Sequence, residues 1–407
     1  MTANKTGGIC MPCYNTKKHA EREIYILENK KDVDLFKGLS DRAEIIIIMH
    51  QKHPSDPLVN YVPYPIPIED IYSQLSKHEE KHLIAYVERQ LLLNNVDVVE
   101  SIGLELAAFR GADLSIVHKT MLETHEYYPC QLFKNANSET VNTLLSRLET
   151  DDVERGNILL SLAWAGTPAV ILKFSEWALN PPAWSKDLYI PVHEYAKDAG
   201  WILANDLKKR TLYLDKCYSL IPNTGSINDE FLNTCVISEK SCHWCNRKLT
   251  HLLEINLKNT LYDFLSISGE RLVIATCDTC SSYSDSIFMD ITNNGNAEWS
   301  KYNKKPGYLP EDSADWEYMP TNCLNISNKP RAVDYAANMF LPTTFSQIGG
   351  MPTWIQDFAY PDCPKCNETM VFLAQISNED IVEYGEGIFY NYICPMCNIT
   401  ATNYQQT

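Results

Sequence analysis

Hydrophobic residues recur with a helical period in the segment that spans residues 71–180. Apolar residues there return every three to four positions, the spacing that gives an amphipathic helix one buried face. Short turns containing Gly, Asp, Asn or Pro separate the periodic stretches. We therefore predict helices at residues 78–93, 96–109, 114–125, 139–148, 153–165 and 169–179.

Two turns in this helical segment repeat each other. Phe109-Arg110-Gly111 and Trp164-Ala165-Gly166 are aromatic-x-Gly turns at an offset of 55 residues, and an amphipathic stretch follows each of them. Helix pairs bury their apolar faces against neighbouring pairs, so this repeat favours an α-solenoid-like stack. A plain helical bundle is the alternative. Either arrangement exposes a ridge of helices that suits protein contact.

Shorter apolar runs before residue 71 indicate mixed character. Residues 23–27 and 44–49 have the composition of buried strands, and residues 32–43 have a helical pattern between them, which predicts one βαβ-like unit. The Pro-rich segment 61–67 excludes regular helix, because each Pro removes a backbone donor and restricts the preceding residue. This segment marks the boundary between the N-terminal region and the helical segment.

The apolar pattern changes to short, strand-like runs in the last part of the chain. Runs at 249–255 and 272–274 are matched by runs at 370–376 and 389–393, and the first runs of the two sets are offset by 121 residues. We therefore predict an α+β protein with a mixed α/β N-terminal segment, a helical-repeat middle and a duplicated β-rich C-terminal domain. The predicted boundaries are 1–70, 71–180, a connector at 181–212, and 213–407 with halves at 213–320 and 321–407.

Cysteines flank both pairs of predicted strands in Cys-x-x-Cys motifs. Such a motif holds two thiolates about 3.5–4 Å apart, the edge of a tetrahedron with Zn–S bonds of about 2.3 Å. A single explanation by metal covers all four motifs, whereas disulfides or idle thiols would need them to arise by chance. The predicted ligands of two structural zinc sites are Cys242, Cys245, Cys277 and Cys280, and Cys363, Cys366, Cys394 and Cys397. A closed four-cysteine set leaves no position for water or substrate, which argues against zinc catalysis.

Charge changes the range of plausible partners. The 407 residues carry a net charge of −17, and residues 211–407 hold 12 Lys and Arg against 23 Asp and Glu. Zinc ribbons that bind nucleic acid depend on basic residues at phosphates, so we expect no nucleic-acid partner. A basic protein would be attracted; an acidic surface that only maintains solubility is the alternative. The first residues lack the apolar core of a signal peptide and no run approaches 18 apolar residues, so we expect a cytoplasmic protein without a membrane partner.

Further cysteines and histidines are weaker candidates for chemistry. Cys10 and Cys13 form a Cys-x-Pro-Cys motif, but no strand precedes it, as a redox site of this type requires. A third metal site and plain structural thiols are the remaining interpretations. His78 and His82 lie one helical turn apart around Glu79, yet the segment has no third ligand in view and reads as a solvated face. Additional ligands for a third site would come from a His or from Cys130, Cys217, Cys235 and Cys323.

Phosphate-binding loops and a nucleophile elbow are also missing from the sequence, so we predict that the protein is not an enzyme.

Residues from about 150 to the end resemble two groups of bacterial proteins. Segments 162–168, 174–184 and 199–201 resemble HEAT-repeat-like proteins. Segments 346–356, 363–366, 370–375 and 404–407 resemble the YwqG-like domain, in which a Gly-Gly-x-Pro-x-Trp-x-Gln stretch precedes the final cysteines. Trp354 and Gln356 of that stretch are candidate partner-binding residues; a Trp that packs against the cysteine turn is the alternative.

The resemblance implies little about chemistry, because no reaction or catalytic residue is established for such proteins. Proteins of this kind are often encoded beside polymorphic secreted toxins, which implies an immunity protein that neutralises a basic toxin by direct binding. A chaperone or assembly factor for a basic cellular protein is the alternative. The closed metal sites and the acidic charge agree with both roles.

Overall fold

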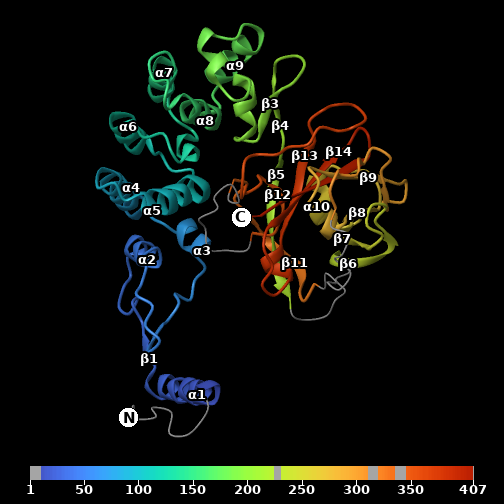
Figure 1. The fold of residues 1–407 in the computed structure, drawn as a ribbon. Coiled ribbons are helices and arrows are strands. Elements are labelled where there is room, and N and C mark those ends of the chain that lie inside the picture. Colours follow the sequence, from blue (N-terminus) through green and yellow to red (C-terminus); the bar gives the residue numbers. More distant parts are fainter. Residues whose placement is uncertain (1–10, 224–230, 310–319, 335–344, 407) are drawn as a thin grey trace, which may run out of the picture.

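The computed structural model describes residues 11–223, 231–309, 320–334 and 345–406, and its architecture is mixed α+β. Figure 1 shows a curved stack of helices on one side of the molecule and a β region on the other, with α1 (Met11–Asn29) beyond the far end of the stack. No helix within the described residues is long and apolar enough to cross a membrane. The predicted fold class is thus confirmed at the level of α+β.

The periodic segments form helices where the apolar pattern predicts them. The predicted helix 96–109 begins as a short α-helix and continues as two π-helical turns, Val99–Gly103 and Leu106–Arg110. Gly111 and Gly166, which close the two predicted aromatic-x-Gly turns, both end a helix in the left-handed conformation, with φ of 54° and 55°. The helices are α3 (Ile68–Ser73), α4 (Lys77–Leu92), α5 (Val96–Val98), α6 (Ser115–Thr124), α7 (Ser138–Arg147), α8 (Arg155–Ala165) and α9 (Pro168–Leu179).

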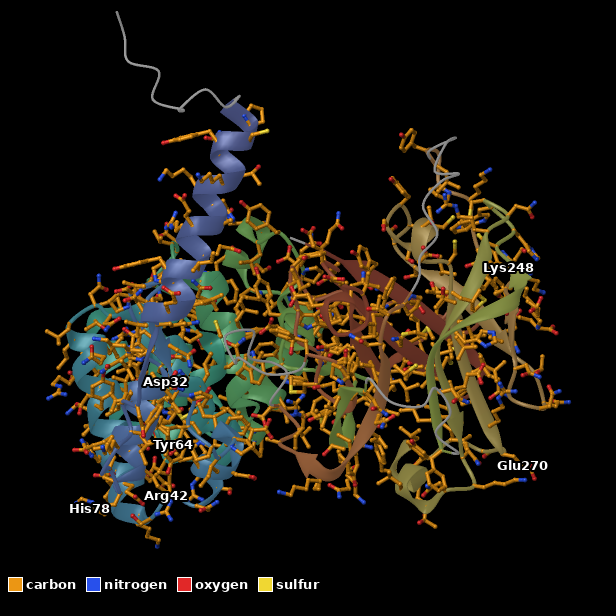
Figure 2. The ribbon with its side chains drawn as sticks, turned by 90° about the horizontal axis from the view of Figure 1, so that it is seen from below. Asp32, Arg42, Tyr64, His78, Lys248 and Glu270 are labelled. Atoms are coloured by element: carbon orange, nitrogen blue, oxygen red, sulfur yellow. The ribbon has the colours of Figure 1, made fainter. Side chains whose placement is uncertain are left out.

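Secondary structure at the N-terminus differs from the prediction. Residues 23–27, predicted as a buried strand, lie inside α1, where Leu27 is 78% exposed. Figure 2 shows this helix projecting away from the rest of the molecule. An apolar run therefore forms an exposed helix here, because too few neighbours surround it to bury it.

The predicted strand at 44–49 is also a helix, α2 (Arg42–Met49). The Asp41 side chain accepts a hydrogen bond from the Ala43 backbone N–H at the helix start, and Ile45 and Ile46 are buried in the helical core. Packing thus overrides the strand preference of a run of isoleucines. The predicted helix at 32–43 instead contains the end of a strand, a turn at 35–38 and irregular chain, and helix begins only at Arg42.

A βαβ unit nevertheless exists, built from other residues than predicted. Strands β1 (Lys31–Val33) and β2 (Val59–Tyr61) pair in parallel, and α2 lies between them in the sequence. The Pro-rich stretch that follows is irregular until Pro67, which precedes α3.

The connector after α9 consists of short elements that lead into the β region. Trp201 at its centre is buried, and its Nε1 donates to the Ala163 carbonyl oxygen at 2.9 Å. The elements are 3-10 turns at Ala183–Asp187 and Val192–Lys197 and the hairpin of β3 (Trp201–Leu203) and β4 (Lys209–Thr211).

The β region contains an eight-stranded sheet of order β10-β9-β15-β14-β13-β12-β5-β11 and a three-stranded sheet of order β6-β7-β8. The four runs predicted as strands beside the cysteines are confirmed as β7, β8, β13 and β14. Short helices α10 (Asp278–Ser281) and α11 (Asn378–Ile381) lie between strands. The strands are β5 (Leu214–Asn223), β6 (Leu232–Ser241), β7 (Lys248–Asn256), β8 (Arg271–Thr276), β9 (Ile287–Ile291), β10 (Ala297–Trp299), β11 (Cys323–Arg331), β12 (Gln347–Gly350), β13 (Val371–Ser377), β14 (Ile388–Cys394) and β15 (Ile399–Gln405).

Strands from the two predicted halves pair with each other. β5 lies between β11 and β12, and β9 pairs with β15, so each contact joins residues before 320 to residues after it. Gly350 ends β12 with a φ of 69°, and a Cβ there would lie 2.6 Å from the Val333 carbonyl oxygen. Glycine is therefore required where β12 approaches the chain closely.

Ion pairs and a shared core connect the helices to the β region. Met351 is buried within the same hydrophobic cluster as the helices. Arg331, whose side chain is 2% exposed, lies 3.3 Å from the Glu69 carboxylate of α3, and Lys329 lies 3.6 Å from Asp70. The helical stack and the β region are thus held together by buried as well as exposed contacts.

Candidate metal centres

The first four-cysteine group forms at the end of β6, the start of β7 and the end of β8. Cys242 and Cys245 lie in the turn from β6 to β7, and Cys277 and Cys280 follow β8 at α10. The Sγ atoms of Cys242 and Cys280 are 3.7 Å apart, and those of Cys245 and Cys277 are 3.5 Å apart. All four sulfurs lie within 4.8 Å of one another.

The second group forms at the ends of β13 and β14. Cys363 and Cys366 lie in the turn before β13, Cys394 ends β14, and Cys397 lies in the turn to β15. The Sγ atoms of Cys366 and Cys394 are 3.7 Å apart, and the four sulfurs again lie within 4.8 Å of one another. The structure therefore brings together the eight cysteines that the sequence singles out, in the predicted sets.

The first turn of each group has the same backbone conformation. Asn246 and Asn367 are left-handed, with φ of 66° and 60°, and their N–H groups donate to the carbonyl oxygens of Cys242 and Cys363 at 2.9 and 2.8 Å. Asn tolerates this conformation better than most residues. Matching sequence at the two turns thus gives matching local geometry.

Both groups have the donor set and spacing of a tetrahedral metal site. The eight cysteines are thiols rather than disulfides, and their Sγ distances are far longer than an S–S bond of about 2.05 Å. They match the edge of about 3.8 Å expected for four sulfurs at 2.3 Å from one ion. Hydrogen bonds with Cys242 and Cys280 raise the pKa of Cys277, so full ionisation of the set requires a balancing cation. The residues present fit a structural divalent metal.

The other cysteines do not form a third group within the described residues. Cys10 lies outside them, and Cys13 is exposed on α1. Burial raises the pKa of Cys217 and of Cys235 to about 12, so both thiols are neutral at physiological pH. Burial also raises the pKa of Cys130, which lies in the helical core. The structure therefore favours the structural-thiol interpretation for these buried cysteines, and the pairing of Cys10 with Cys13 stays a prediction.

The candidate pair His78 and His82 lies on either side of Glu79 in the sequence of α4, and the Glu79 carboxylate already accepts hydrogen bonds within the fold. His78 and His82 are exposed, and Figure 2 shows His78 at the outer edge of the helical stack. Glu79 is buried and accepts hydrogen bonds from the Ser76 N–H at 2.8 Å and the Arg42 N–H at 2.9 Å. It thereby caps α4 and ties it to the start of α2.

Glu79→Ala is expected to lower the free energy of unfolding by about 1 kcal/mol at neutral pH, since two backbone donors lose their acceptor. Burial alone would raise the pKa of Glu79, but the hydrogen bonds from Ser76 and Arg42 lower it from 4.5 to about 2. A lowered folded-state pKa stabilises the protein above pH 4.5 and loses this effect as the pH falls toward 2. The difference between wild type and variant in urea unfolding should therefore shrink with acidification. A difference that stays constant from pH 7 to pH 3 would contradict this role.

Trp354 and Gln356 lie close in sequence but in different surroundings. The Trp354 ring packs against Tyr390 and Tyr360, with centroid distances of 4.8 and 5.3 Å, and is half-buried. Gln356 is exposed, and its Nε2 donates to the Gln406 carbonyl oxygen at 2.7 Å. Trp354 thus packs against tyrosines of the cluster that also contains Cys363 and Cys394, whereas Gln356 faces the surface. Packing of Trp354 against the cysteine turn and partner binding by either residue stay predictions.

A buried contact between a histidine and a carboxyl group in the helical stack is not predicted from the sequence. His50 Nε2 lies 2.8 Å from Glu105 Oε2, and the two side chains are 8% and 0% exposed. The sequence does contain an indication of this contact, because Glu105 is the one acid in the apolar run at 102–108. Such an acid must find a partner when the run is buried.

A known protein aligns with this chain over its full length. The chain is 37% identical over 413 residues to a Salmonella typhimurium strain LT2 protein described as uncharacterised protein YpfL, and the alignment covers 100% of this chain and 96% of that protein. No family model matches the chain. No solved structure matches it.

Proposed function

This chain belongs to the family of the Salmonella protein YpfL, and we propose that it is a non-enzymatic, zinc-stabilised protein that acts by binding another protein. The closed geometry of both four-cysteine groups carries the proposal. The four sulfurs of each group lie within 4.8 Å of one another and can occupy all four positions of a tetrahedral ion, so an ion bound there would have no open position for water or substrate. Such an ion would hold chain segments together, and zinc is the ion that best suits a structural site of four thiolates.

The specific role that we propose is immunity against a secreted toxin encoded beside this protein. Two features support it: the resemblance of residues 150–407 to proteins found in such neighbourhoods, and a net charge of −17 that would attract a basic partner. Neutralisation would be stoichiometric, with a few buried anchors supplying affinity and charge supplying the association rate.

Co-expression with the neighbouring toxin gene tests this role. We expect growth to be restored and the two proteins to elute together from gel filtration as a stable complex. A catalytically dead toxin serves as the control for expression burden, since it should bind equally without affecting growth. The role is wrong if the toxin still kills at full expression of this protein and no complex forms. A complex with a basic cellular protein in cells that lack the toxin gene would favour the chaperone alternative.

A further inference from the structure

A groove lies where the two halves of the β region meet. One wall comes from α10 and its flanks, with Asp278, Thr279 and Tyr283. The opposite wall comes from the turn between β13 and β14, with Glu383, Tyr384 and Glu386. The cavity has a volume of about 450 Å³, within the range of about 300–1,000 Å³ that is usual for binding sites.

The groove extends beyond this first cavity. A second hollow of about 570 Å³ shares Ser282, Tyr283 and Tyr404 with the first and continues to Gln356. Two hollows that share three lining residues fit an extended chain segment better than a compact small molecule. Gln356, singled out in the sequence as a candidate contact, lies on this path.

Aromatic rings and acids dominate the first cavity. Phe389 and Tyr404 pack against each other with ring centroids 4.9 Å apart, while Tyr283 and Tyr384 on the rim are 42% and 94% exposed. Among the described residues that line the cavity, Asp278, Glu383 and Glu386 are acids and Arg247 is the one cation. The Arg247 Nη1 already donates to Thr279 Oγ1 at 3.0 Å. The lining therefore carries excess negative charge beside aromatic faces.

The turn that presents Tyr384 is held in a defined conformation. Asn378 Nδ2 and the Tyr404 hydroxyl both donate to the Glu386 carbonyl oxygen, at 2.8 and 2.6 Å. Tyr384 itself has a φ of 61°, a conformation that costs a bulky residue free energy. The fold thus fixes an exposed aromatic side chain at the edge of an acidic cavity.

We propose that this groove binds an extended, arginine-bearing segment of the partner protein. A guanidinium can stack on the exposed tyrosine faces and pair with the Glu383 and Glu386 carboxylates, the two interactions that acids and aromatic rings offer together. The inference rests on the proposed protein-binding function and assigns it a surface. The first four-cysteine group takes part by fixing α10, which carries Cys280 and one wall of the groove.

A labelled peptide of alternating Arg and Gly, blocked at both ends, tests the groove against the full-length, metal-loaded protein by fluorescence anisotropy. We expect wild type to bind it and to ignore the corresponding Glu peptide. Glu383→Gln with Glu386→Gln should weaken binding by about tenfold, and Tyr384→Ala by about fivefold, while Tyr384→Phe keeps the aromatic face and most of the affinity.

The matched control removes the same charge elsewhere. Glu139 and Asp152 are exposed acids on the helical side, so Glu139→Gln with Asp152→Asn changes net charge equally and should leave peptide affinity within about twofold of wild type. Equal weakening in both double variants, or no binding by wild type, overturns the groove assignment. Neither result touches the immunity proposal, which depends on complex formation with the toxin.

Discussion

Cys366→Ser is expected to leave the β region unfolded and to release the metal from the second four-cysteine group. Structural zinc contributes about 10–16 kcal/mol in small zinc domains. Typical domains have a net free energy of unfolding of only about 5–15 kcal/mol, so the loss of one of four ligands is expected to cost more than the net stability of the β region. The turn of Cys363 and Cys366 also precedes β13, which pairs with both β12 and β14 near the middle of the large sheet. Cys245→Ser should act in the same way through β7 and β8.

Metal content and folding must be measured together to test this result. Elemental analysis of the wild type should return zinc at about two ions per chain, and far-ultraviolet circular dichroism should show loss of strand signal in the variants. Cys323→Ser is the matched control, because Cys323 has similar partial exposure but lies outside both groups. It should keep the metal and the fold. A Cys366→Ser protein that is soluble, folded and metal-free, but no longer binds its partner, would place the metal in recognition instead of in folding.

Local patterns along the chain determine much of this fold. The six helices predicted between residues 78 and 179 and the four strands predicted beside the cysteines are confirmed, because apolar periodicity reports directly on which face of an element is buried. The four-cysteine groups are predicted for a similar reason: each Cys-x-x-Cys turn is a local geometry, and the repeat at 121 residues shows which strands accompany it. Both kinds of signal depend on neighbours in the sequence.

The predictions that differ from the structure concern segments whose conformation depends on contacts with residues distant in the sequence. The run at 44–49 has the composition of a strand, yet Asp41 caps it as a helix whose isoleucines fill the core beside α3 and α4. Residues 23–27 are mostly apolar but lie in the exposed helix α1. A short apolar run does not indicate whether the folded chain provides a neighbouring element to bury it. The groove could not be predicted at all, because its walls are about 100 residues apart and meet only when the two halves of the β region pair.

The His50–Glu105 pair is another such contact, and Glu105→Ala is expected to lower the free energy of unfolding by about 3–5 kcal/mol. The carboxylate is fully buried, and its loss leaves His50 without the group that lies 2.8 Å from its Nε2. Burial raises the pKa of Tyr72 in α3, and the Glu105 charge raises it further. One substitution thus disturbs the contacts of α2, α3 and the π-helical turns at once. Chemical denaturation at neutral pH, followed by tryptophan fluorescence, measures the loss.

An exposed pair joins the same two parts of the chain and supplies the control. Lys52 follows α2 and pairs with Asp97 of α5, and the two side chains are 87% and 67% exposed. Because solvent screens such a pair, Asp97→Ala should cost less than about 1 kcal/mol. Glu105→Gln should fall between the two, since it keeps the shape and one hydrogen-bonding oxygen but removes the charge. Equal costs for Glu105→Ala and Asp97→Ala would mean that the buried pair contributes no more than a surface contact. The α2 segment would then be held mainly by its apolar residues and by the hydrogen bond from the Arg42 N–H to Glu79.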